Sequence, residues 1–306
     1  MVVHLPLSGR LPDWQPVIKT RNKVDFETFV ASVAKSRDDY PIIGVVDGLP
    51  GIGKSVATYN HVIGLKERPH NGLRSAMLIE LKPGVTRREV ARSIVVAAGE
   101  KPRGHNINRF SLADDAIAAI LDNDIEYIIY DEGDRLDEDS FEMIRDIFDA
   151  TGCPMIIVGL PSIRHVIARH EKIESRVGFY LRFTPLNHDE TLRKILPELV
   201  FPAWTYDPTN PADLAMGEYL LGKVGGSFRR LRNVLNLASE IVYNPANQTK
   251  ITRDDIDEAV IYAQRHVDNA DLQSAKPGLS RSGDRGEAEI KSEQRNAYKR
   301  GNRQGS

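Results

Sequence analysis

The chain has 306 residues, of which 41% are hydrophobic and 27% are charged, and its formal net charge is −2. This composition is typical of a folded protein with room for one large domain or two smaller ones. It excludes an overall electrostatic attraction to nucleic acid, so any such contact must come from local basic patches.

Membrane and disulfide-stabilised classes are also disfavoured. No apolar run approaches the roughly 18 residues of a membrane span, and residues 1–9 lack the layout of a signal peptide. A single cysteine, Cys153, excludes a disulfide framework and fits a reducing cytosol. We therefore expect a cytoplasmic protein without membrane contact.

The first elements lead into a glycine-rich loop. Residues 1–24 are punctuated by proline and are expected to be extended, and apolar residues from Phe26 to Ala34 then recur at helical spacing. The β-prone run Ile42–Asp47 precedes Gly48-Leu49-Pro50-Gly51-Ile52-Gly53-Lys54-Ser55, which fits the P-loop pattern G-x-x-x-x-G-K-[ST]. A helix should follow from Gly53 to about Leu65.

The P-loop spacing has a physical reason. Glycines let the backbone turn so that successive N–H groups point at phosphates, and the next helix aims its positive dipole end at them. Lys54 would reach the β- and γ-phosphates of ATP, and Ser55 would hold Mg²⁺. The predicted nucleotide-binding residues are Gly48, Pro50, Gly51, Ile52, Gly53, Lys54, Ser55 and Val56.

Strands and helices alternate up to Pro185. Strands are expected at 76–81, 125–131, 155–159 and 179–183. A capping box at Thr86–Glu89 opens one helix, Ser111–Asp114 should cap a second, and residues around Phe141 form a third. The pattern predicts an α/β fold with a parallel sheet flanked by helices, in a nucleotide-binding subdomain at residues 25–185.

The character changes after Pro185. Helical patterns alone run from His188 to Val267, which predicts a helical lid subdomain at residues 186–268 whose last helix is capped by Thr252–Asp255. Residues 269–306 are polar, charged and poor in apolar side chains, so we expect a disordered tail. Its basic residues would serve as a partner- or DNA-binding arm, or only keep the chain soluble.

The third strand ends in two adjacent carboxylates. Asp131 and Glu132 form the Walker B arrangement, in which the Asp holds the Mg²⁺ shell and the Glu acts as general base on the attacking water. Two acidic residues after an apolar run are common at solvated strand ends. Their pairing with a P-loop makes the functional interpretation the stronger one.

Three segments resemble one family. Tyr130-Asp131-Glu132-Gly133-Asp134-Arg135-Leu136, Met155–Gly159, and Arg176 through Leu181-Arg182-Phe183 are similar to the AAA+ transposition regulators TnsC, TniB and MuB, and most similar to TnsC of CRISPR-associated transposons. The resemblance covers about residues 17–264. It implies a P-loop AAA+ ATPase that uses ATP and Mg²⁺, oligomerises on duplex target DNA and acts with a transposase and a TniQ-like targeting factor.

The resemblance also implies roles for single arginines. Arg176 matches the arginine finger that completes the ATP site of a neighbouring subunit, with Arg182 as a weaker alternative. In Gly225–Leu231, which resembles the start of a sensor-2 helix, Arg229 is narrowly favoured over Arg230 as the contact to the γ-phosphate. The plain alternative is that these arginines are solvated surface residues.

One position departs from the family. After the fourth strand, AAA+ proteins usually carry Asn or Thr as sensor 1, whereas here Gly159 is followed by Leu160 and Pro161, with Ser162 as the nearest polar group. This departure puts fast hydrolysis in doubt, and ATP binding does not depend on it.

The family contacts DNA through basic residues after the second strand and the following helix. The matching residues are Arg87, Arg88, Lys101 and Arg103. Contacts to phosphates would be sequence-independent and salt-sensitive, although exposed arginines at a helix start are often merely solvated.

The leading hypothesis is thus an ATP-dependent regulator of DNA transposition that forms a ring or filament on DNA. The alternatives are a helicase loader or replication initiator, for which an expected winged-helix domain finds no room, and a nucleotide-locked DNA scaffold with negligible turnover. A signalling NTPase is less favoured, because no sensor domain is attached. The transposase, the targeting factor and any guide RNA are left open by the sequence.

Overall fold

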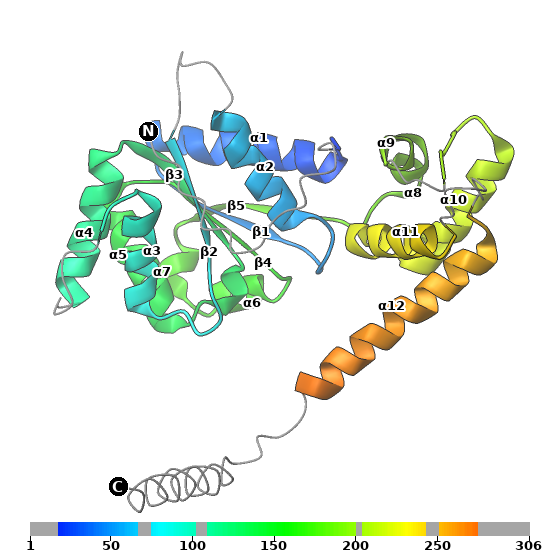
Figure 1. Cartoon of the computed structure of the whole chain (residues 1–306). Helices are drawn as coiled ribbons and strands as arrows, with labels where there is room; N and C mark the ends of the chain where they lie inside the picture. The colour runs from blue at the N-terminus through cyan, green and yellow to red at the C-terminus, as the bar shows by residue number, and fades with distance from the viewer. Residues whose placement is uncertain (1–17, 67–74, 102–108, 200–203, 243–250, 275–306) are drawn as a thin grey trace, which may run out of the picture. The chain divides into compact units, whose positions relative to one another are not determined.

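The first part of the chain forms a five-stranded sheet between helices (Figure 1). The computed structural model describes residues 18–66, 75–101, 109–199, 204–242 and 251–274. All neighbouring strands are parallel, and their order is β2-β3-β4-β1-β5. The strands are β1 (Ile43–Asp47), β2 (Ser75–Glu80), β3 (Ile125–Asp131), β4 (Met155–Gly159) and β5 (Val177–Arg182). The predicted α/β fold with a parallel sheet is confirmed.

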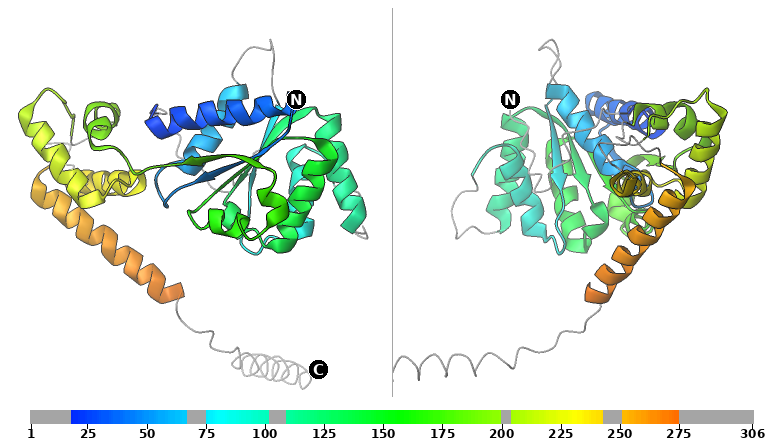
Figure 2. Two further views of the ribbon diagram at one scale, coloured as in Figure 1. Left: turned by 180° about the vertical axis from the view of Figure 1, so that it is seen from behind. Right: turned by 45° about the vertical axis from the view of Figure 1, so that its right-hand side comes forward.

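Helices cover both faces of the sheet (Figures 1 and 2). On one face, α1 (Arg21–Lys35) and α2 (Lys54–Lys66) pack with one apolar cluster that includes Phe26 and Val46. On the other face, a second cluster joins the sheet to α3 (Arg87–Ala97), α4 (Arg109–Asp122), α5 (Glu138–Thr151), α6 (Ile163–Ile167) and α7 (Glu171–Glu174). Burial on both faces explains why β4 is apolar along its whole length and β1 is apolar up to its last residue, Asp47.

Only helices follow β5 among the described residues. They are α8 (His188–Glu190), a π-helical turn (Thr191–Ile195), α9 (Leu196–Glu198), α10 (Pro211–Val224), α11 (Phe228–Val242) and α12 (Arg253–Ser274). Thr252 and Asp255 form the predicted reciprocal cap of α12. The predicted change to helical structure after Pro185 is therefore confirmed.

The chain divides into two compact units at Ala259/Val260, so the sheet and the helices up to that point belong to one unit. In the second unit, the structure describes the continuation of α12 to Ser274. The predicted subdomain boundary near residue 185 stays a prediction.

Three expectations about element ends were wrong. The first helix begins at Arg21, inside the segment predicted to be extended, because Thr20 caps it by accepting a hydrogen bond from Lys23 N. α4 begins at Arg109, so Ser111 lies inside the helix and is not its cap. α12 continues to Ser274, past the predicted start of the disordered tail at residue 269, and the rest of that tail lies outside the described residues.

Gly44 in β1 tests the packing of α1 on the sheet. A Cβ at Gly44 would lie 2.8 Å from both Phe29 Cζ and Val33 Cγ2. Gly44→Ala should therefore lower the free energy of unfolding by about 1–3 kcal/mol through overpacking. Gly64→Ala is the matched control, because a Cβ there meets nothing within 4 Å. Denaturant unfolding measures the free energy of unfolding of each variant and of the wild type. If Gly44→Ala is as stable as the wild type, α1 is not packed against β1 at this position.

Candidate functional site

The carboxyl ends of three parallel strands meet at one edge of the sheet. β1 ends at Asp47 and runs into the P-loop, β3 ends at Asp131, and β4, between them, ends at Gly159. Ligands of open α/β sheets bind at this edge. A cavity of 440 Å³ lies here, within the first compact unit.

The cavity wall comes from three parts of the chain. The P-loop and α2 contribute Pro50, Gly51, Gly53, Lys54, Ser55 and Val56, which are six of the eight residues predicted to bind the nucleotide. The ends of β3 and β4 contribute Asp131, Glu132, Asp134, Gly159 and Leu160, and α11 contributes Phe228, Arg229, Arg232 and Asn233.

Gly48 and Ile52 do not line the cavity, because they pack between the P-loop and the apolar core. Ile52 is buried in the apolar core, and a Cβ on Gly48 would lie 2.6 Å from Ile52 Cδ1 and 2.8 Å from Phe183 Cβ. Gly51 and Gly53 have φ angles of 75° and 101°, in the region that favours glycine. These conformations explain the glycine spacing of the motif.

Lys54 is tied into the P-loop. Its Nζ donates to the carbonyl oxygens of Gly48 at 2.6 Å and Leu49 at 3.0 Å. Burial lowers the pKa of Lys54, and the nearby carboxylates of Asp131, Glu132 and Asp134 oppose that shift. The ammonium group is thus held beside a cluster of negative charge at the place where phosphates are expected.

Asp131 and Ser55, which are far apart in the sequence, are in contact. Asp131 is only 6% exposed, and it accepts hydrogen bonds from the Ser55 hydroxyl and from Glu132 N at 2.9 Å. Burial raises the pKa of Asp131, and both hydrogen bonds oppose this shift. One hydroxyl and one carboxylate fit the oxygen ligands that Mg²⁺ takes from a protein when phosphates and waters complete its shell.

Glu132 has an uncommon backbone conformation. Its φ of 61° and ψ of 39° are left-handed, which is rare for residues other than glycine and is concentrated at functional positions. The Glu132 carboxylate lies 3.6 Å from the Arg135 guanidinium. Arg135 in turn donates to the Leu81 carbonyl, so a fixed neighbour holds the predicted general base at the cavity wall.

The first residues of α11 form the part of the cavity wall that comes from the helices after β5. Arg229 N donates to the Gly51 carbonyl oxygen at 3.0 Å, and Arg229 lines the cavity, whereas Arg230 does not. A contact from Arg229 to a γ-phosphate stays a prediction. Arg232 and Asn233 were missed by the sequence analysis, although their spacing of three and four residues from Arg229 could have revealed a shared helix face.

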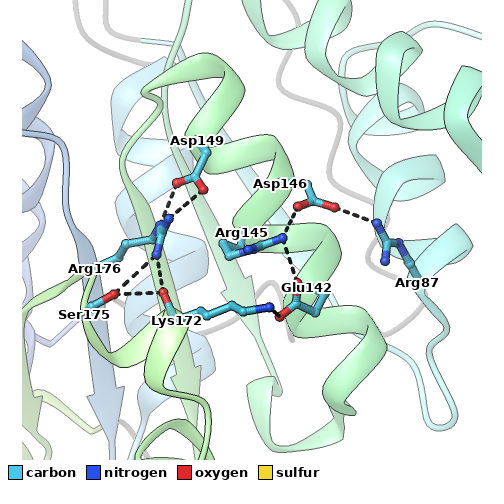
Figure 3. A network of polar contacts seen from close by, with 8 residues as sticks. All are labelled: Arg87, Glu142, Arg145, Asp146, Asp149, Lys172, Ser175 and Arg176. Carbon is cyan, nitrogen blue, oxygen red and sulfur yellow. Dashed lines mark hydrogen bonds and ion pairs between the residues drawn. The ribbon is translucent and has the colours of Figure 1, made fainter.

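Arg176 lies at the amino-terminal ends of the strands, opposite the carboxyl ends that carry the cavity. Its carbonyl accepts from Ile43 N at the start of β1, whereas the P-loop follows the end of this strand, roughly 15 Å away. The Arg176 guanidinium makes two hydrogen bonds of 2.6 Å with Asp149 (Figure 3).

The alternative finger, Arg182, lies at the carboxyl end of β5. It pairs at 2.9 Å with Asp47, which is fully buried and also pairs with Arg164.

The three predicted DNA contacts that the structure describes do not form one cluster. Arg87 pairs with Asp146 at 2.6 Å (Figure 3), and Arg88 beside it is exposed. Lys101 is also exposed, but it follows the far end of α3, an 11-residue helix about 16 Å long. Arg103 lies outside the described residues.

Comparison with known proteins adds to this geometry. The family described as "AAA domain" matches residues 37–167, which span β1 to β4 and the P-loop. The chain has an AAA+ P-loop fold.

In the part of the chain that the structure describes, no helix has the length and apolar character to cross a membrane.

Three relatives illustrate the range of similarity. A "Potential ATP-binding protein" of Staphylococcus aureus is 25% identical over 58% of this chain and 70% of its own length. The Aeropyrum pernix ORC1 protein in complex with DNA is 18% identical, with a TM-score of 0.62 over 83% of this chain and 68% of that one. Cdc6p from Pyrobaculum aerophilum is 14% identical, with a TM-score of 0.62 over 81% and 68%. The AAA domain and the ATP-binding relative support a nucleotide-binding protein of the ATPase type.

Lys54→Ala should weaken binding of ATP about 10²-fold, because charge-assisted hydrogen bonds to the phosphates are lost. Titration calorimetry with ATP and Mg²⁺ measures the affinity. Lys82→Ala, at an exposed lysine after β2, is the control and should bind as the wild type does. Unchanged ATP affinity in Lys54→Ala would contradict the assignment of the cavity.

Proposed function

We propose that the protein is an ATPase that regulates DNA transposition: it binds ATP, oligomerises on duplex target DNA and recruits or activates a transposase. The observation that supports assembly is the position of Arg176 at the edge of the sheet opposite the P-loop. A nucleotide site that uses this arginine is complete only when a second copy of the chain supplies it.

Within one subunit, the proposed roles follow the cavity wall. Lys54 and the P-loop amides bind the β- and γ-phosphates, Arg229 contacts the γ-phosphate, and Glu132 takes a proton from the attacking water. Mg²⁺, held by Ser55 and Asp131, would neutralise phosphate charge when bound.

The pairing of Arg176 with Asp149 bears on the assembly step. The pair is bidentate and partly exposed, with side-chain exposures of 25% and 42%. An approaching triphosphate carries more negative charge than one carboxylate, so a docked neighbour can draw the guanidinium away from Asp149. In an isolated subunit, the Arg176 guanidinium would then stay paired with the Asp149 carboxylate.

DNA contact is proposed at phosphates and independent of sequence. Arg88 and Lys101 are exposed and are the proposed contacts among the described residues, whereas Arg87 would first have to leave Asp146. Arg103 stays a predicted contact. The role in transposition rests on the similarity of residues 130–136 and of Leu181-Arg182-Phe183 to TnsC-like regulators. The partners implied are a transposase and a TniQ-like targeting factor.

The alternative function is that of a replication initiator or helicase loader. It draws on the likeness to ORC1 and Cdc6p, which at 14–18% identity concerns the fold alone.

A DNA scaffold with negligible turnover is the second candidate. The observation in its favour is Leu160, a cavity-lining apolar residue at the position where AAA+ proteins usually have a polar sensor. In this alternative ATP locks the assembly and is not consumed.

Arg176→Ala should abolish most DNA-stimulated ATP hydrolysis while ATP affinity of the subunit stays unchanged. Lys54→Ala should be inactive alone, but it still carries the finger. Mixing the two variants should restore hydrolysis, since a Lys54→Ala subunit can complete the ATP site of an Arg176→Ala neighbour. Phosphate release measures the effect, and Arg169→Ala, an exposed arginine nearby, is the control. Full activity of Arg176→Ala, or no rescue on mixing, would contradict a finger acting between subunits.

A further inference from the structure

The cavity wall carries a third carboxylate, from Asp134, beside those of Asp131 and Glu132. The P-loop and Walker B motifs assign no role to it. Asp134 acts electrostatically on the Lys54 ammonium, as Asp131 and Glu132 do. Because Asp134 and Lys54 line the same cavity, Asp134 shares the wall that faces the expected γ-phosphate.

Asp134 is anchored to the end of β4. Its Oδ1 accepts a hydrogen bond from Leu160 N at 3.0 Å. A Cβ on Gly159 would lie 3.1 Å from this oxygen and 3.2 Å from Asp134 N, and a Cβ on Gly133 would lie 2.4 Å from Ile157 Cγ2. The two glycines let the turn that carries Asp134 lie directly against β4, where a polar side chain of β4 itself is missing.

The charge of Asp134 limits what it can bind. A carboxylate repels phosphate oxygens, so Asp134 is unsuited to contact the γ-phosphate directly. An ionised carboxylate only accepts hydrogen bonds, and the donor that the reaction brings to this place is the attacking water. Oδ1 accepts from Leu160 N, and the carboxylate has a second oxygen, Oδ2, that can accept a hydrogen bond from a water.

We propose that Asp134 accepts a hydrogen bond from the attacking water and orients it for Glu132, in place of the missing sensor-1 side chain. This inference rests on the proposed ATPase function. In the step, the water oxygen bonds to the γ-phosphorus and the bond to the β–γ bridging oxygen breaks. Glu132 takes one water proton, Asp134 takes none, and ADP and phosphate leave.

The competing explanation is that Asp134 only fastens its turn to Leu160. Asp134→Asn separates the two roles. The amide Oδ1 can still accept from Leu160 N, but Nδ2 then replaces Oδ2 and presents a donor where the water needs an acceptor. A purely structural role therefore predicts an Asp134→Asn protein that hydrolyses ATP like the wild type.

The experiment measures DNA-stimulated ATP hydrolysis by the full chain. Asp134→Asn should lower kcat about 10²-fold, the cost of misplacing a reacting group, while KM and ATP affinity change less than about twofold. Binding of ADP with aluminium fluoride and Mg²⁺, which mimics the transferring phosphoryl group and its water, should weaken, whereas binding of ADP alone should not. Asp139→Asn, at an exposed Asp in the first turn of α5, is the control and should leave kcat unchanged.

The outcomes separate this inference from the proposed function. A wild-type kcat in Asp134→Asn, with Glu132→Gln inactive, would overturn the role of Asp134 and leave the ATPase standing. A loss of ATP affinity or of thermal stability that accounts for the whole effect would also overturn it. A wild-type protein without turnover on DNA would overturn both.

Discussion

The parallel alignment of β1, β3 and β4 is the constraint on which the site depends. Parallel strands place their carboxyl ends together, so the P-loop after β1, the acidic pair after β3 and the Asp134 contact after β4 share one edge. The same alignment places the start of β5, and Arg176 with it, at the other edge. The closeness of the cavity residues and the distance of Arg176, the proposed finger, from that cavity thus have one cause.

Charge balance is the second feature of this edge. The wall places three carboxylates beside Lys54, Arg229 and Arg232, and Asp131 is nearly buried, which is costly unless its charge is compensated. Ser55, Glu132 N and Arg135 each offset part of this cost. The left-handed backbone of Glu132 adds strain at the same point. In the proposed site, a bound Mg²⁺ ion would add positive charge beside these carboxylates and offset more of this cost.

Local signals predicted most of the fold and half of the site. The glycine spacing of the P-loop and the apolar strands are short-range properties, so β3 and β4 were predicted with their true bounds. Contacts made across the fold were not predictable: Arg87 meets Asp146, 59 residues away, and Asp134 meets Leu160, 26 residues away. The choice between Arg229 and Arg230 depended on how α11 is turned, and only its hydrogen bond to the P-loop shows that.

We propose that ATP binding assembles copies of the chain on duplex DNA. Electron microscopy of the wild-type protein on a long duplex, with a non-hydrolysable ATP analogue or with ADP, tests it most directly. We expect regular multi-subunit assemblies along the DNA with the analogue and none with ADP. Single scattered subunits with both nucleotides, or the same assemblies without any nucleotide, would contradict it.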